Sequence, residues 1–105
     1  MKINLEELKQ RLRSYKEKDI IITEHARLQA FVREVSLTEV KNNIINPEKL
    51  VYAQKQESQR YKEEKYDCYF AYSKHLYHRY ILTINRKIII VTIIKINRDW
   101  QKAIG

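Results

Sequence analysis

The 105-residue sequence is nearly devoid of glycine, proline and cysteine, with one residue of each. A single cysteine, Cys68, excludes an internal disulfide and therefore a fold held together by disulfides. Glycine and proline are the residues of flexible linkers and tight turns, so their scarcity argues against several domains joined by linkers. The longest apolar run, 88–94, is interrupted by Thr92 and is far shorter than the ~20 residues of a membrane-spanning helix. We therefore expect one domain, residues 1–105, with its own core and no membrane partner.

Negative charge is also in the minority. The chain has 21 Lys and Arg residues against 13 Asp and Glu, which gives a formal net charge of +8. Such an excess favours a polyanionic partner such as nucleic acid. The alternative is that the abundance of Lys and Ile reflects genome composition and has no functional meaning. Residues 1–18 carry a charge every two or three positions, unlike a secretory signal, so we expect a cytoplasmic protein.

Three segments of the first half have helical periodicity. Residues 4–17 are predicted to form an amphipathic helix that begins with the capping pair Asn4 and Glu7. A second helix, 23–34, is capped by Thr23. A third, 36–46, begins with the capping box SLTE and ends at Pro47, because the residue before proline avoids the helical region. In the second helix, one face carries the large apolar residues, which we expect to be buried: Leu28, Phe31, Val32 and Val35.

After Pro47 the apolar period changes to two, which indicates strands over 49–55, 66–72, 76–84 and 88–96. The last of these is apolar on both faces, so it should be central or covered on both sides. Residues 19–23 are either a strand or an extended entry, 57–65 a charged loop, and 97–102 a short helix with Trp100 packed on the sheet. The predicted fold is α+β. Tandem helices pack on one face of a three- to four-stranded antiparallel sheet, with an extra N-terminal helix and a short C-terminal helix.

Several residues suggest chemistry, each with a simpler alternative. His25, Gln29 and Arg33 form a polar line along the second helix, although a histidine in a first helical turn often bonds only to a neighbouring loop. His75 and His78 with Cys68 match no zinc-ligand spacing, so no metal is expected. Tyrosines at 66, 69, 72, 77 and 80 could stack on RNA bases, but alternating tyrosines in strands more often serve packing.

The segment TEHARLQAFVREVSLTEVKNNIINPEKLV resembles a group of small proteins that begin with a His-Ala helix. That group is similar to a branch of the RelE-like toxin superfamily, which includes RelE, BrnT and ParE. The residues that match its pattern are His25, Ala26, Arg33, Ser36, Val40, Pro47 and Glu48. Gln29 stands where the group usually has Arg, and Glu34-Val35 replaces the usual Gly-Ile. Outside about residues 20–55 only the order of strands agrees.

The resemblance implies a small antiparallel sheet with two helices on one face and a basic open face. In RelE-type toxins that face holds messenger RNA on the ribosome and promotes attack of a 2′-hydroxyl on the adjacent phosphate. This reaction needs a base, an acid and cations that stabilise the charge on the phosphorane. By residue type and placement, the catalytic candidates are His78, Arg79, Tyr80 and Arg98. The RNA-binding candidates are His25, Arg33, Lys74, Arg86, Lys87 and Lys95. We expect the cations around the Ile-rich hairpin to form one site, in which Arg79 and Arg98 hold the phosphate.

The resemblance therefore predicts a toxin of a toxin–antitoxin system: an RNA-binding, ribosome-associated mRNA endoribonuclease without metal or cofactor. Its expected partners are RNA or the ribosome and an acidic or DNA-binding antitoxin. One alternative is a non-catalytic module of the same fold that binds nucleic acid or, as ParE does, a protein partner. Another is a homodimer held by the 4–17 helix and the Ile-rich strand.

Overall fold

The structure is a computed structural model that describes residues 3–57, 63–98 and 101–102. Within these residues it contains three α-helices, two single 3-10 turns and five strands. In chain order they are α1 (Leu5–Arg13), η1 (Glu17–Asp19), β1 (Ile20–Ile22), α2 (Glu24–Val32), α3 (Leu37–Ile45), η2 (Pro47–Lys49), β2 (Leu50–Gln56), β3 (Glu64–Ala71), β4 (Tyr77–Ile84) and β5 (Ile88–Ile96). Each helix begins at its predicted cap: Asn4, Thr23 and Ser36 each accept a hydrogen bond from the backbone N–H three residues on. Trp100 lies outside the described residues, and of its predicted helix Gln101 and Lys102 are helical.

The five strands form one sheet in the order β1-β5-β4-β3-β2. Neighbouring strands are antiparallel except at one edge, where Ile20–Ile22 pairs in parallel with Ile88–Ile90. The prediction of three to four antiparallel strands is therefore corrected to a mixed, mostly antiparallel sheet of five. A strand of three residues is too short to show a period of two, so its pairing could not be read from the pattern. Strand β5 lies between β1 and β4 over Ile88–Ile90 only, so it is interior at its start rather than central along its length.

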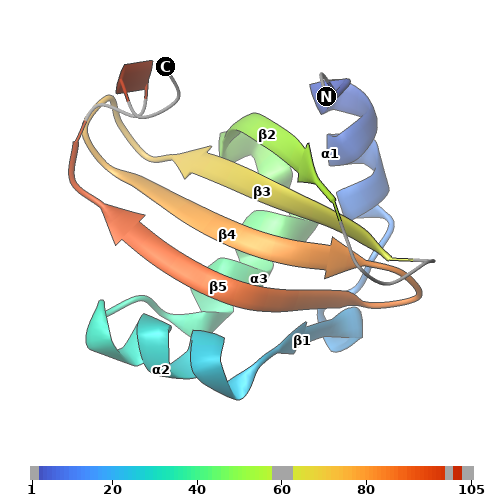
Figure 1. The fold of residues 1–105 in the computed structure, drawn as a ribbon, viewed down its shortest axis with the longest axis horizontal. Helices are drawn as coiled ribbons and strands as arrows, with labels where there is room; N and C mark the ends of the chain where they lie inside the picture. Colours follow the sequence, from blue (N-terminus) through green and yellow to red (C-terminus); the bar gives the residue numbers. More distant parts are fainter. Residues whose placement is uncertain (1–2, 58–62, 99–100, 103–105) are drawn as a thin grey trace.

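All three helices contribute to one core on a single face of the sheet. Figure 1 shows α3 behind the sheet, α1 beside β2 and β3, and α2 along the β5 side. Leu8 and Leu12 of α1 and Val40 and Ile44 of α3 are buried in this core. The strands contribute residues that alternate except at the irregularities of β2 and β5: Ile20, Ile22, Leu50, Ala53, Tyr66, Cys68, Phe70, Tyr80, Leu82, Ile84, Ile88, Ile90 and Ile93. No helix of the described part of the chain is long and apolar enough to cross a membrane.

The predicted buried face of α2 is wrong for three of its four residues, and only Val35, which follows the helix, is buried as expected. Leu28, Phe31 and Val32 are 61%, 82% and 68% exposed, whereas the residues buried from this helix are Ala26 and Ala30. The reason lies in the short β1 strand. It pairs with only the first three residues of β5, and α2 lies along the part of β5 that follows. Small side chains allow this close approach, so the large ones are turned outward.

Gln29 and the end of α2 complete this arrangement. The Gln29 side-chain oxygen accepts a hydrogen bond from the backbone N–H of Ile93, at 2.9 Å, which satisfies a donor on the free edge of β5.

After the helix, Glu34 adopts a left-handed conformation with φ of 56°. The N–H of Val35 then donates to the carbonyl of Ala30 and that of Glu34 to the carbonyl of Phe31, the pairing of a Schellman motif.

One β-bulge sets which side chains of β5 face the core. Ile81 pairs with Thr92 while Leu82 pairs with Ile90, so Val91 is the extra residue. The pairing between β3 and β4 is regular throughout, so no bulge separates His78 from Arg79. These two residues therefore point to opposite faces of the sheet.

The face opposite the helices is packed with aromatic side chains rather than lined with cations. Tyr69 and Tyr77 are 6% and 1% exposed and stack with ring centroids 5.5 Å apart, and Tyr52 meets Tyr69 edge-on at 5.4 Å. Packing, the more common role of strand tyrosines, accounts for these residues, and their rings are not accessible for base stacking. The strand residues on this face do not form the basic surface that the resemblance implied.

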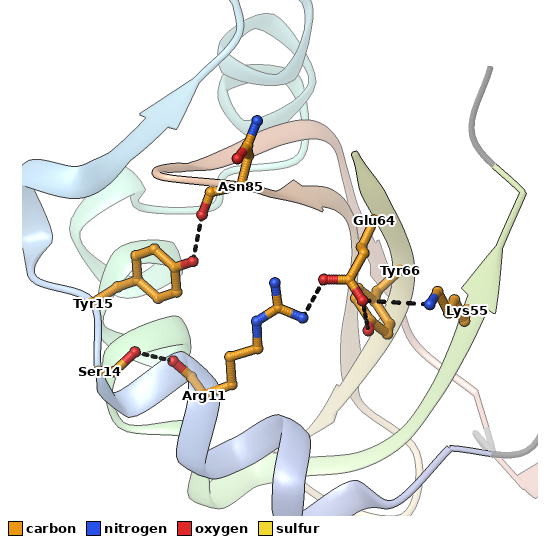
Figure 2. Close-up of polar contacts among 7 residues, drawn as sticks. All are labelled: Arg11, Ser14, Tyr15, Lys55, Glu64, Tyr66 and Asn85. Atoms are coloured by element: carbon orange, nitrogen blue, oxygen red, sulfur yellow. Dashed lines mark hydrogen bonds and ion pairs between the residues drawn. The ribbon is translucent and has the colours of Figure 1, made fainter. Parts of the chain in front are cut away.

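Polar contacts fasten α1 to the sheet at the end where β4 turns into β5. Figure 2 shows Arg11 of α1 in an ion pair with Glu64, whose carboxylate also accepts from Lys55 and from the Tyr66 hydroxyl at 3.3 Å each. The Tyr15 hydroxyl donates to the carbonyl oxygen of Asn85, at 2.5 Å. The predicted helix 4–17 ends at Arg13, and Tyr15 makes its contact from the segment that follows.

Candidate functional site

A buried polar cluster lies between α3 and the end of the sheet where β3 turns into β4. Its members are Glu39 and Asn43 of α3, Tyr72 after β3, and His78 and Tyr80 of β4. The Asn43 side-chain nitrogen donates to the Tyr72 hydroxyl at 2.7 Å and to the Tyr80 hydroxyl at 2.9 Å. His78 Nδ1 lies 2.7 Å from the Tyr80 hydroxyl. Asn43, His78 and Tyr80 are at most 3% exposed, so this is a hydrogen-bonded network inside the protein.

The hydrogen bonds of the network meet at the two tyrosine hydroxyls. The Asn43 side chain donates to both, so each oxygen accepts at least one hydrogen bond. Besides burial, the charge of Glu39 raises the pKa of Tyr72 and opposes the lowering of the pKa of His78. The Tyr80 hydroxyl and His78 Nδ1 share one hydrogen bond, in which the donor is set by the ring tautomer. In the tautomer with the proton on Nδ1, Nε2 carries a free electron pair and can accept a proton.

Burial keeps the side chains of Tyr72, His78 and Tyr80 in their neutral forms. Burial, the largest effect, lowers the pKa of His78; Lys95 lowers it further and Glu39 opposes the change. Burial also raises the pKa of Tyr72 to about 12 and raises that of Tyr80. At neutral pH the cluster therefore holds an uncharged imidazole and two protonated hydroxyls, both bonded to the Asn43 amide.

Cations surround this end of the sheet. Lys95 is directly opposite His78 in the register of β4 and β5, and the Lys49 ammonium lies 5.3 Å from the centre of the Tyr72 ring. Lys74 is in the β3–β4 turn and Arg98 follows the end of β5, so both belong to the same end. Arg33 is at the C-terminal end of α2, which runs alongside β5 in the same direction. Four of the predicted RNA-contact and catalytic cations, Arg33, Lys74, Lys95 and Arg98, thus share an end with His78.

The other predicted residues lie elsewhere, so the cations around the Ile-rich hairpin do not form one site. Arg86 and Lys87 are in the β4–β5 turn, eight to nine residues from His78 along the sheet, or roughly 25 Å at 3.3 Å per residue. His25 is exposed in the first turn of α2. The β4–β5 turn was expected to lie beside the catalytic residues, and the length of an eight-residue strand prevents that.

Arg79 is committed to a different partner on the opposite face. Its Nε donates to the Asp67 carboxylate at 2.8 Å, and the guanidinium lies 5.2 Å from the centre of the Tyr69 ring. Asp67 is 2% exposed, and its hydrogen bonds to the guanidinium raise the pKa of Arg79. Binding a phosphate through Arg79 would leave this buried carboxylate unpaired, which is strongly unfavourable. The expected role of Arg79 in holding the scissile phosphate is therefore not compatible with its position.

A second polar region, the pocket beneath α1, is a weaker candidate. It is lined by Arg11, Lys55 and Glu64 together with Tyr66 and residues of the first turn of α1. Glu64 already neutralises both cations, and in spite of its burial these contacts hold the pKa of its carboxyl below the usual range. Among the residues that the structure describes, no three His, Cys, Asp or Glu side chains are grouped as metal ligands.

Two members of the polar cluster were not candidates from the sequence, Glu39 and Asn43, and Tyr72 was considered only for stacking on RNA bases. Asn43 offered a signal, because it falls on the same helical face as the buried Val40 and Ile44. A polar residue at an inward position needs a partner inside the protein. Its partners come from residues 29 and 37 positions further along the chain, which a local pattern cannot identify.

The fold and the cluster define an α+β protein with helices on one face of a mixed sheet and a histidine-centred polar network at one end. No protein-family model, curated protein or solved structure matches the chain.

Proposed function

We propose that the protein binds single-stranded RNA at the cationic end of the sheet and cleaves it with His78 as the general base. The observation that carries this proposal is the hydrogen bond between Nδ1 of His78 and the Tyr80 hydroxyl, which itself accepts from Asn43. A base whose second nitrogen is held by an oriented partner is the arrangement that activates hydroxyl nucleophiles in many enzymes. The lowered pKa of His78 supports the same role, since a base must be unprotonated at the working pH.

In the proposed reaction, RNA binding first opens access to the ring of His78, which is 3% exposed in the free protein. Nε2 of His78 then takes the proton of a ribose 2′-hydroxyl. The 2′-oxygen then attacks the adjacent phosphorus, and the bond from phosphorus to the 5′-oxygen breaks. The 5′-oxygen receives the proton from His78, so the products are a 2′,3′-cyclic phosphate and a 5′-hydroxyl. The ammonium of Lys95, next to His78 in the register, is suited to stabilise the charge on the phosphorane. Tyr80 acts through His78 and positions it.

The fold agrees with this proposal at a coarse level. Tandem helices followed by four antiparallel strands, with an earlier strand parallel to the last, are consistent with a RelE-like topology, although the number of strands differs. On this proposal the partners are RNA, on or off the ribosome, and an acidic or DNA-binding antitoxin. The proposed site differs from the one implied by the resemblance, because it is on the helical side of the sheet.

The test is cleavage of a short labelled single-stranded RNA, with and without ribosomes, in the presence of EDTA. We expect fragments that end in a 2′,3′-cyclic phosphate, and no cleavage of an otherwise identical RNA with 2′-O-methyl groups. His78→Ala should reduce cleavage by about 10²- to 10⁴-fold, the usual contribution of a general base. Tyr72→Phe, which removes the hydroxyl that accepts from Asn43, should also reduce it. His75→Ala, in the exposed turn beside the cluster, is the matched control and should leave cleavage unchanged.

Binding is measured separately. Because contacts to phosphate release counterions, affinity should fall at least tenfold between about 50 and 200 mM salt. Lys95→Ala should weaken binding, while Lys87→Ala, at the far end of the sheet, should not. Salt-dependent binding without cleavage by the wild type would refute the catalytic role and leave the non-catalytic RNA-binding module. Absence of binding at low salt would refute the function altogether.

A further inference from the structure

A cavity beneath the first two turns of α1 is separate from the polar cluster around His78. It has a volume of about 370 Å³, and its lining combines apolar side chains with charges of both signs: Ile3, Leu8, Glu7, Arg11, Lys55 and Glu64. Cavities of ~300–1,000 Å³ with an apolar wall and a few charged groups are the usual sites of small molecules. In the sheet, Glu64 is paired with Ile84, six residues along β4 from His78, which is roughly 20 Å at 3.3 Å per residue. A ligand of this cavity is therefore independent of the proposed function.

The positive side of the cavity has one more charge than its own carboxylate supplies. Arg11 and Lys55 are both paired with Glu64, so two cations and one carboxylate leave a charge of +1. Figure 2 shows Arg11 reaching from α1 toward Glu64, and Lys55 reaching toward it from β2. A guanidinium has five N–H donors and an ammonium has three, and Glu64 accepts one bond from each group. The remaining donors can hold a second carboxylate, which arginine binds through two parallel hydrogen bonds.

The negative side of the cavity is Glu7, four residues before Arg11. A Glu followed by an Arg at this spacing in a helix ordinarily forms a surface ion pair. Here Arg11 is directed to Glu64 instead, and among the described residues no cation lies within ion-pair distance of the Glu7 carboxylate. The Asn4 side-chain oxygen accepts a hydrogen bond from the backbone N–H of Glu7, at 3.1 Å, which fixes the first turn of the helix. Glu7 is therefore held in place and able to accept hydrogen bonds from a cationic group of a ligand.

We propose that this cavity binds a small zwitterion with an apolar side group, namely an α-amino acid with an aliphatic side chain. Arg11 and Lys55 hold its carboxylate, Glu7 holds its ammonium group, and its side chain packs on Ile3 and Leu8. The lining has two cations and two carboxylates, so it carries no net charge, and neither does the ligand. A simple anion would be repelled by the two carboxylates and a simple cation by the guanidinium and the ammonium.

The cavity is open to the solvent. The side chains of Arg11 and Lys55 are 37% and 38% exposed, so a ligand can enter without detachment of α1. Water screens charges at such positions and weakens their interactions. We therefore expect a dissociation constant of about 1 mM.

The first experiment is a titration of the whole ¹⁵N-labelled chain with L-leucine, followed by the NMR shifts of its backbone amides. We expect saturable shifts around Glu7 and Lys55 that are half-complete at about 1 mM. Two matched ligands each lack one charged group of leucine: 4-methylpentanoate has no ammonium and 3-methylbutylamine has no carboxylate. Each should bind at least about tenfold more weakly, because a hydrogen bond between charged groups is lost. Absence of saturable shifts with leucine overturns the proposal. Equal binding of 4-methylpentanoate also overturns it, since the site would then be one for simple anions.

The second experiment locates the site with variants. Glu7→Gln and Arg11→Gln should each weaken leucine binding at least about tenfold. Glu7→Gln should not weaken the binding of 4-methylpentanoate, which has no group for Glu7 to hold. Glu6→Gln is the matched control, because Glu6 is adjacent on α1, 73% exposed and outside the lining, and it should leave leucine binding unchanged. Circular dichroism checks that the variants are folded. Leucine binding that survives both Glu7→Gln and Arg11→Gln overturns the assignment to this cavity.

Discussion

Among the described residues, Glu34 is the one position where a side chain is combined with a positive φ. A Cβ atom in the left-handed region is crowded by the neighbouring carbonyl, at a cost of roughly 1–2 kcal/mol. The position ends α2 and allows the two hydrogen bonds to the carbonyls of Ala30 and Phe31. Glycine has no Cβ atom and adopts this conformation without the cost.

We therefore predict that Glu34→Gly raises the free energy of unfolding by about 1 kcal/mol, after part of the gain is offset by the greater freedom of glycine in the unfolded chain. Urea denaturation at low protein concentration measures the change. Glu34→Ala keeps the Cβ atom while removing the charge, so it should bring no gain. Equal stabilisation by both substitutions would mean that the carboxylate, and not the backbone, is the source.

The site at the residue scale was partly accessible from the sequence. His78 and Tyr80 were identified by type and placement, and they do lie together, because alternate residues of a strand share a face. The same alternation separates Arg79 from them. The sequence does not show which residues are neighbours across the strands. It therefore could not reveal that Asp67, twelve positions earlier, forms an ion pair with the guanidinium of Arg79.

At the scale of elements, α1 is attached to the rest of the protein by two kinds of contact, buried apolar side chains and an ion pair, whose contributions to stability differ. Leu12 is completely buried, whereas the side chains of Arg11 and Glu64 are 37% and 35% exposed. Exposed ion pairs contribute little because solvent and salt screen them. The helix is therefore held mainly by its leucines.

From this we predict that Leu12→Ala lowers the free energy of unfolding by about 2–5 kcal/mol, the range for large-to-small changes in a core. Arg11→Ala, one residue away, should lower it by less than about 1 kcal/mol. Chemical denaturation of the two variants side by side gives the comparison. A larger loss for Arg11→Ala would show that the Glu64 cluster, rather than the core, fixes the helix.

The helix α2 shows why periodicity can identify an element and still assign the wrong face. Its cap and its length agree with the prediction within a few residues. The face was wrong because the rule assumes that the largest side chains are buried. Here the position along β5 demands close approach, which Ala26 and Ala30 provide, and that demand comes from the three-residue length of β1. This constraint comes from the tertiary structure, so the spacing of apolar residues within the helix does not reveal it.

For the molecule as a whole, the buried His78 links stability to pH. Burial lowers its pKa in the folded state below the value of about 6.5 expected in the unfolded chain. Below that pH the unfolded chain binds the extra proton more readily, so stability falls as the pH drops through about 6.5 toward the folded pKa. Carboxyl groups in general titrate mostly at lower pH, so histidine is the residue type expected to change its charge just below pH ~6.5.

We predict that the unfolding free energy of the wild type is lower at about pH 5.5 than at about pH 7.5, and that His78→Gln reduces this difference. His25→Gln and His75→Gln are matched controls, since both side chains are exposed, and they should leave the difference unchanged. Thermal or urea unfolding of each variant at the two pH values measures this difference in unfolding free energy. A pH dependence that survives His78→Gln would assign the effect to other groups.

The cover that α2 provides for β5 also bears on how the protein avoids aggregation. Beyond its three residues of pairing with β1, the Ile-rich strand β5 has a free edge, and its sequence is apolar, uncharged until Lys95 and rich in β-branched residues. Strands of this kind readily add strands from other chains and are the segments that nucleate amyloid. Gln29 blocks one of the free backbone donors and the body of α2 shields the others. Detachment of this single helix, without unfolding of the rest, would uncover the part of the chain most prone to self-assemble.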